Sequence, residues 1–169
     1  MTKKKFLLAV AIPLLILLAM IIKPQATVLF GQQIVLETKA FGPTDLFRGD
    51  YVSISFAISV IPKSKVTLPI NKIVNNNLFV SLKQEGKYYV VDQVSETKPK
   101  QGIYLKGKFQ GIYNELNELD KFTVDYSLDK YFVKQGSGAD LQQDANREGL
   151  VGTVRVLGGY GVVTGLAPR

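Results

Sequence analysis

The sequence predicts a mostly β fold, an antiparallel barrel or sandwich (α+β at most), that follows an N-terminal transmembrane helix. Three observations lead to this prediction. An apolar run near the N-terminus, from Phe6 to Ile22, has the composition of a membrane helix. From residue 25 onward, many short segments alternate apolar and polar residues with a period of two, which is typical of β-strands. Gly, Asn and Pro separate these segments at near-regular spacing, the pattern of turns between antiparallel strands.

The apolar run is bounded by lysines, with Lys3–Lys5 on one side and Lys23, followed by Pro24, on the other. As a helix it spans about 25 Å, slightly less than a hydrocarbon core of about 30 Å, and the flanking lysines can reach the headgroups. The run is longer than the apolar part of a secretory signal, and no small-x-small cleavage pattern directly follows it. We therefore expect an uncleaved anchor, with a cleaved signal sequence as the alternative.

The lysines before the run predict the topology of the chain, because basic flanks stay on the cytoplasmic side. We expect a single-pass protein of the cell membrane with a cytoplasmic N-terminus and an extracytoplasmic C-terminal domain. The predicted division is an anchor or signal sequence at residues 1–24 and an exported β-rich domain at residues 27–169. A short linker, Lys23–Thr27, would hold the domain close to the bilayer.

Composition excludes several classes of function. The chain contains no cysteine and no histidine, so disulfides, thiol nucleophiles, Cys or His zinc sites and a Ser-His-Asp triad are all excluded. Its net charge is +7, but four of the lysines flank the apolar run and the other basic residues form no dense cluster, so nucleic-acid binding is not expected. The acidic residues of segment 140–148 do not have EF-hand spacing, and neither a metal nor a cofactor is expected.

The first exported strand is expected at residues 32–41, with Ile34 and Leu36 on one face. A connection follows in which one helical turn at 46–48 ends at Gly49. The next strand is expected at 51–62. Its first face carries four apolar residues at alternate positions: Val52, Ile54, Phe56 and Ile58.

The rest of the domain is expected to contain further strands, including two hairpins with glycine turns. They are the segment 65–70, a hairpin at 75–96 with Glu85-Gly86 at its tip, strands at 102–113 and 121–135, and a hairpin at 151–166 around Gly158-Gly159. Gly111 is a candidate β-bulge. Residues 95–102 are expected to form a polar loop, 114–121 a short helix or long turn, and 138–149 a helix.

The octapeptide GDYVSISF, residues 49–56, resembles the signature of the GDYXXLXY family of bacterial membrane-anchored proteins of unknown function. Ile54 stands where the pattern has Leu and Phe56 where it has Tyr, and both keep an apolar residue on the same face. The preceding Pro-x-Asp-Leu-x-Arg at 43–48 also fits. The resemblance runs from about Gln33 to the final hairpin. It implies no established activity, but it implies an accessory role beside a multi-spanning membrane protein.

A second block, Tyr131-Phe132-Val133 followed by Gly136-x-Gly138, resembles another part of the family pattern. Gln135 stands where the family often has a carboxylate, which argues against acid chemistry there. No catalytic residue is identified. The candidate binding residues of the two blocks are Arg48, Asp50, Tyr51, Tyr131, Gly136 and Gly138.

The tripeptide Arg48-Gly49-Asp50 also matches the sequence that adhesion receptors bind, but such a site needs an exposed loop tip. Here it lies between apolar Leu46-Phe47 and a strand, so a structural turn is favoured. In that turn Gly49 adopts a positive φ and Asp50 accepts hydrogen bonds from the backbone.

The sequence therefore favours a non-catalytic accessory or binding module that acts with an integral-membrane partner through a strand edge or a surface. The first alternative is a Ser/Lys hydrolase resembling membrane-anchored signal peptidases, although no serine occurs between the anchor and Ser53, and Ser64-Lys65 lies in a polar turn. The second alternative is binding of an anionic cell-wall polymer. It requires the remaining basic residues to share one face.

Overall fold

The structure is a computed structural model that describes residues 3–42, 51–66, 68–69, 73, 77–113, 121–132 and 149–169. In these residues one long helix precedes a domain built from ten strands. The predicted helical turn at 46–48, the predicted helix at 138–149 except for its last residue, and the segment 114–120 lie outside the described residues.

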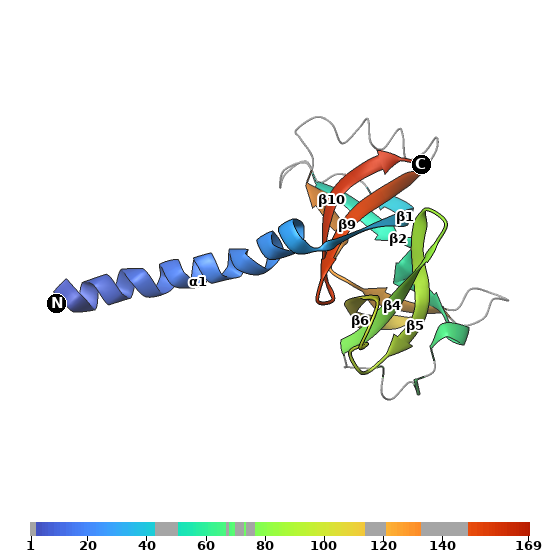
Figure 1. Cartoon of the computed structure of the whole chain (residues 1–169), viewed down its shortest axis with the longest axis horizontal. Coiled ribbons are helices and arrows are strands. Elements are labelled where there is room, and N and C mark those ends of the chain that lie inside the picture. The colour runs from blue at the N-terminus through green and yellow to red at the C-terminus, as the bar shows by residue number, and fades with distance from the viewer. Residues whose placement is uncertain are drawn as a thin grey trace.

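Helix α1 spans Lys3–Phe30 and projects away from the β domain (Figure 1). Its side chains from Ile12 to Ile22 are exposed. The part from Ala9 to Phe30 is long and apolar enough to cross a membrane. The sequence predicts a linker at Lys23–Thr27, but the helix continues through these residues to Phe30. The linker prediction was wrong because contacts with the β domain hold the last two turns of α1 in helical form.

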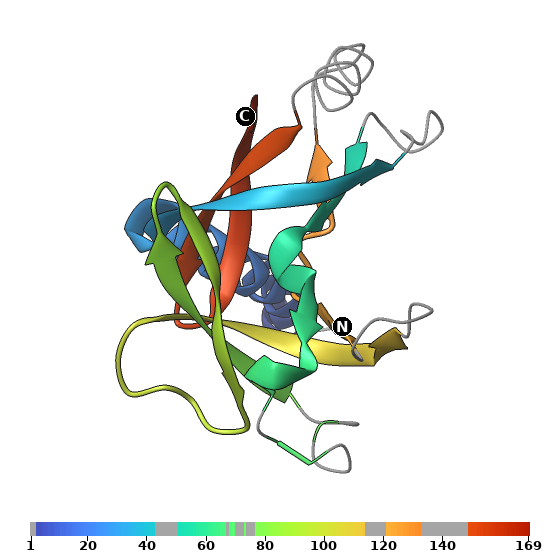
Figure 2. The same ribbon diagram turned by 90° about the vertical axis from the view of Figure 1, so that its right-hand side faces the viewer.

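Two five-stranded antiparallel sheets form the domain and curve into a half-barrel, which confirms the predicted fold class (Figure 2). The first sheet has the order β10-β9-β1-β2-β8 and the second β3-β7-β6-β4-β5. The strands of the first sheet are β1 Gln32–Gly42, β2 Tyr51–Phe56, β8 Lys130–Phe132, β9 Leu150–Leu157 and β10 Tyr160–Pro168. Those of the second are β3 Val60–Pro62, β4 Asn77–Glu85, β5 Tyr88–Ser95, β6 Ile103–Tyr113 and β7 Lys121–Asp125.

Two segments predicted as single strands are each divided between the two sheets. The 51–62 segment is broken by the 3₁₀ turn η1, Ala57–Ser59, so that β2 lies in the first sheet and β3 in the second. The 121–135 segment is broken after Asp125, where Ser127 adopts a φ of 56° and its N–H donates to Asp125 Oδ1 (2.6 Å). Alternation continues through each break, so periodicity alone did not reveal either crossing.

The core lies between the sheets and contains the predicted inward faces. Ile34 and Leu36 of β1 are fully buried, as expected. The alternating apolar residues of the two divided segments are also buried: Ile54, Phe56, Ile58, Phe122, Val124, Tyr126 and Leu128. From Phe122 to Leu128 burial keeps a period of two, whereas in the other segment it shifts after Ile58, so that Ile61 and not Val60 is buried.

Both predicted hairpins form. β4 and β5 turn at Gly86 and Lys87, one residue later than predicted, with Gly86 at a φ of 63°. β9 and β10 turn at Gly158 and Gly159, which have positive φ values of 58° and 84°, as a type I′ turn requires. In β6 the pairing register shifts between Phe109 and Gly111, beside the predicted bulge.

The described residues of the predicted strand at 65–70, which are 65, 66, 68 and 69, belong to no strand. The 3₁₀ turn η2 spans Lys63–Lys65, and the following Val66 makes only an isolated bridge to Val94 of β5.

Candidate functional site at the helix-proximal face

The described parts of the two sequence blocks of the family resemblance, residues 51–56 and 131–132, lie side by side. β2 pairs with β8 in antiparallel register, so that Tyr51 is opposite Phe132 and Val52 is opposite Tyr131. Tyr131 is half-buried and packs against the core, whereas Phe132 is 71% exposed. Of the candidate binding residues, Tyr51 and Tyr131 are therefore neighbours in one sheet. The others, Arg48, Asp50, Gly136 and Gly138, lie outside the described residues.

The junction between α1 and β1 is closely packed and contains no flexible spacer. Thr27 is 1% exposed, and its Oγ1 donates to the carbonyl of Lys23 (2.9 Å). The N–H of Gly31 donates to the Thr27 carbonyl (2.9 Å), and a Cβ at Gly31 would lie 2.3 Å from that oxygen. Arg155 of β9 donates from Nη1 to the Gly31 carbonyl (3.0 Å). Hydrogen bonds and close packing thus fix the end of the helix against the first sheet.

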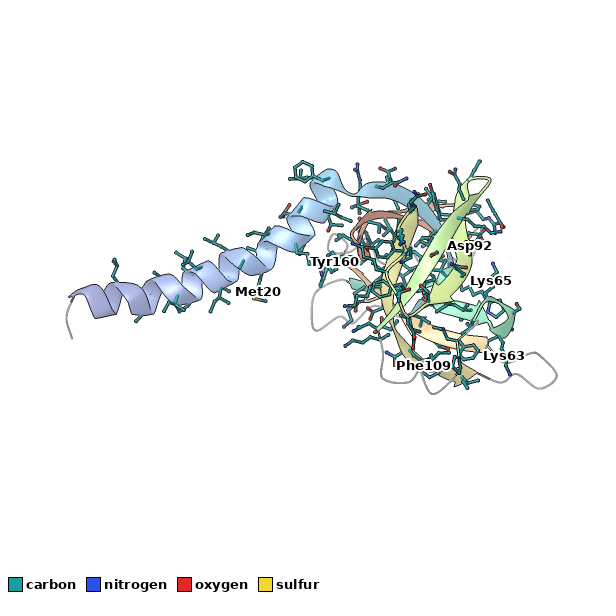
Figure 3. All side chains as sticks on the ribbon, turned by 60° about the horizontal axis from the view of Figure 1, so that its bottom comes forward. Met20, Lys63, Lys65, Asp92, Phe109 and Tyr160 are labelled. Carbon is teal, nitrogen blue, oxygen red and sulfur yellow. The ribbon has the colours of Figure 1, made fainter. Side chains whose placement is uncertain are left out.

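The β9–β10 hairpin connects this junction to the second sheet. The backbone N–H of Lys106 in β6 donates to the Gly159 carbonyl (2.8 Å). A Cβ at Gly159 would lie 2.5 Å from the ring of Tyr104, so the hairpin needs glycine there for packing as well as for its φ. On the other side of the hairpin, Lys23 Nζ lies 4.3 Å from the centroid of the Tyr160 ring. Figure 3 shows Tyr160 on the side of the domain from which α1 emerges.

Two adjoining hollows lie on this side of the domain, which we call the helix-proximal face. The basic pocket, of about 240 Å³, lies between α1, β6 and the hairpin. Its lining includes Lys23, Asn77, Lys106, Lys108, Asp125, Ser127 and Tyr160. The edge groove, of about 300 Å³, lies between β8 and β10. Its lining includes Leu128, Lys130, Tyr131, Phe132, Tyr160, Val162 and Val163. Both hollows share Ser127, Tyr160 and Gly161, so they are continuous around Tyr160.

The titratable groups inside the domain have structural roles. Tyr126 donates its hydroxyl to the Ile58 carbonyl (3.0 Å), and burial raises the pKa of this phenol far above its usual value. On the side away from α1, Lys65 donates its ammonium to the carbonyl of Val91, whereas the neighbouring Ser64 is exposed. This lysine therefore contacts a backbone carbonyl rather than the serine that a Ser/Lys hydrolase requires. The described residues contain no group of three or more His, Cys, Asp or Glu side chains that could hold a metal ion.

Sequence reasoning identified one residue of the helix-proximal hollows, Tyr131, and missed the basic pocket. A signal for the pocket was present in the sequence Lys106-Gly107-Lys108. In a strand, residues two apart share a face, so both lysines point away from the core while Gly107 faces inward. Nothing in the sequence indicated that Lys23 and Tyr160 would join them.

The fold and the junction define a class of protein: a β half-barrel continuous with an apolar helix that is long enough to cross a membrane. The family model described as GDYXXLXY protein matches residues 13–166. The chain therefore belongs to the GDYXXLXY family, and the match confirms the resemblance carried by residues 49–56. No curated protein and no solved structure matches the chain.

Proposed function

We propose that the protein is anchored in the bacterial cell membrane by α1, with its N-terminus in the cytoplasm and its β domain on the extracytoplasmic side. There it serves as a non-catalytic accessory module that binds a multi-spanning membrane protein. The length and apolar character of α1 support the anchor. The basic flank Lys3–Lys5 supports the orientation.

One observation carries the binding role: the edge groove opens beside the base of the membrane helix. β10 forms one end of its sheet and is hydrogen bonded to β9 on one side only within the described strands. Phe132, on the opposite wall, exposes 71% of its surface. An edge strand beside apolar side chains suits an extended peptide, whose main chain pairs with the strand while alternate side chains enter the groove.

The rigid junction explains how such a groove would meet a membrane partner. From Lys23 to Phe30 the helix rises about 10 Å, so the domain lies just beyond the headgroups when the apolar run is in the bilayer. Because the last turn is fixed by Thr27, Gly31 and Arg155, the domain cannot turn freely about its anchor. The groove is thus presented at one height and direction to segments that leave the bilayer nearby.

Site-specific photocrosslinking of the full-length protein in its native membrane tests this function. A photoreactive residue replaces Phe132 or Val162 in the groove, and Lys87, at the exposed tip of the β4–β5 hairpin, as the matched control. Mass spectrometry identifies the captured protein. We expect one recurrent multi-spanning membrane protein from both groove positions and none from position 87. Capture of the same proteins from all three positions, or of none from the groove, would refute the proposed function.

The family motif is tested in the same experiment. Arg48→Ala and Asp50→Asn are introduced into the chain that carries the crosslinker at position 132. Loss of the crosslink in a variant that still unfolds cooperatively would make the motif part of the contact. An unchanged crosslink would assign Arg48 and Asp50 to the structural turn.

A further inference from the structure

Among the residues that the structure describes, the lining of the basic pocket carries a net positive charge. Lys23 comes from α1, and Lys106 and Lys108 come from β6. Within the part of the chain that the structure describes, none of these three ammonium groups is paired with a carboxylate. The one acidic residue in the lining, Asp125, accepts hydrogen bonds from the Ser127 N–H (2.6 Å) and from Gln110 Nε2 (3.3 Å). Three cations thus face a cavity that holds one carboxylate, and that carboxylate already has partners.

The position of Lys23 sets the level of the basic pocket relative to the bilayer. Lys23 is the first charged residue after the apolar run that ends at Ile22, so it lies at the headgroup layer when α1 spans the bilayer. The pocket that Lys23 lines must then open toward the same layer. The residues of α1 that directly precede Lys23 are apolar and exposed, with Ile21 54% and Ile22 66% exposed. A cationic cavity bordered by apolar groups matches the boundary between phosphates and acyl chains.

The size and lining of the pocket restrict what it can hold. A volume of about 240 Å³ is below the range of about 300–1,000 Å³ that is typical of sites for drug-sized ligands, so a small polar group fits better. Of the four glycines in the lining, Gly158 has open space at the position of a Cβ, so this turn residue adds no side chain to the cavity. Asn77 and Ser127 add groups that can hydrogen bond to hydroxyls. Lysines around a small polar cavity suit a phosphate that carries a short polyol.

We propose that the basic pocket binds a glycerol-phosphate anion, and that the source of this anion is the headgroup of an anionic phospholipid such as phosphatidylglycerol. Lys23, Lys106 and Lys108 surround the phosphate, and Asn77 and Ser127 lie within the same cavity as the glycerol hydroxyls. This inference rests on the proposed membrane anchoring, but it does not depend on the protein partner. Bound lipid would also reinforce the fixed orientation of the domain about α1, because the pocket joins the helix to β6 and to the hairpin.

Native mass spectrometry of the full-length protein, purified in detergent, tests the lipid site. The protein is incubated with equal amounts of phosphatidylglycerol and phosphatidylcholine of the same acyl chains. We expect at least fivefold preferential retention of phosphatidylglycerol. In K106Q/K108Q this preference should be lost, because each lysine near the headgroups contributes about a fivefold factor. The matched control K39Q/K87Q removes the same charge at two exposed positions outside the pocket and should leave the preference unchanged.

Further measurements in the same experiment distinguish a lipid headgroup from other sources of the anion. If soluble glycerol phosphate displaces the lipid at equal concentration, the anion site is supported but its source is a free or polymeric glycerol phosphate. No preference in the wild type, or an equal loss in both double variants, would overturn the proposal. The single variant K108Q, at an exposed side chain, should give an intermediate preference for phosphatidylglycerol. It still tests the site if the double variant misfolds. The intact mass shows whether α1 is retained. A chain that lacks α1 would contradict the anchoring, whereas a complete chain without lipid preference would contradict the lipid site alone.

Discussion

The β4–β5 and β9–β10 hairpins arise from the same sequence signal, a glycine turn between alternating strands, but their surroundings differ. Gly86 has no atom within 4 Å of the position that a Cβ would occupy, and its neighbours Lys83 and Glu85 form an exposed ion pair (2.9 Å). Gly159 lies against the Tyr104 ring and is hydrogen bonded to β6. The β9–β10 hairpin thus joins the helix and both sheets, whereas the β4–β5 turn projects into solvent. Local sequence specifies a turn, but its energetic importance depends on what the turn contacts.

The largest expected contrast is between the two glycines. Gly159→Ala should lower the free energy of unfolding by about 3 kcal/mol, because the substitution adds a Cβ against the Tyr104 ring at a φ of 84°. The ring has little freedom to move, since it is buried and stacks edge-on with Phe79 (5.8 Å between centroids). Gly86→Ala should cost about 1 kcal/mol, from its φ alone. Chemical denaturation of both variants in detergent measures the difference, and equal losses would show that the hairpins are equivalent.

Two tyrosines extend the comparison to hydrogen bonds. Tyr126→Phe should cost about 2 kcal/mol, because it leaves the buried carbonyl of Ile58 without its donor. Tyr89→Phe should cost less than about 0.5 kcal/mol, because the Tyr89 hydroxyl is exposed to water and bonds only to Gln84 Oε1 (3.3 Å). The same denaturation series measures both. A loss for Tyr89→Phe as large as for Tyr126→Phe would contradict the contrast.

Alkaline pH should lower the free energy of unfolding of the domain through the same buried phenol, Tyr126. Burial raises the pKa of Tyr126, so the folded state keeps this group protonated after the unfolded chain, with a pKa of about 10, has begun to ionise. The contribution of Tyr126 to stability is therefore complete below about pH 10 and is lost progressively above it. Unfolding free energies between pH 8 and 11 should decline less steeply in Tyr126→Phe than in the wild type. Parallel profiles would show that this phenol ionises equally in both states.

The smallest contrast is between two cationic side chains on strands. Arg155→Met should cost about 1 kcal/mol, because it removes the donor to the Gly31 carbonyl at the end of α1. Lys83→Met should produce no resolvable change. The hydrogen-bonded ion pair with Glu85 raises the pKa of Lys83 and lowers that of Glu85, but solvent surrounds this pair and salt screens it. Thermal unfolding at low and high salt distinguishes the two, and a salt-sensitive loss at Lys83 would reverse the ranking.

The sequence by itself determined most of the local structure. Alternation located most of the strands, the glycines at 86 and at 158–159 located both hairpins, and the octapeptide at 49–56 indicated the family that the comparison confirms. These features depend on neighbours in the chain, because side-chain direction follows strand period and positive φ favours glycine. The apolar run predicted a helix for the same reason, although not where it ends.

Only the tertiary structure decided the features that depend on residues far apart in the chain. The crossings after Phe56 and Asp125 do not interrupt the alternation of the sequence, although in the first of them the buried positions shift between Ile58 and Ile61. The continuation of α1 to Phe30 requires Arg155 and the β9–β10 hairpin, which lie more than a hundred residues away. The basic pocket likewise assembles Lys23, Lys106 and Tyr160 from three elements. Periodicity indicates which way a side chain points, but the contacts of that side chain depend on how the two sheets and the helix pack.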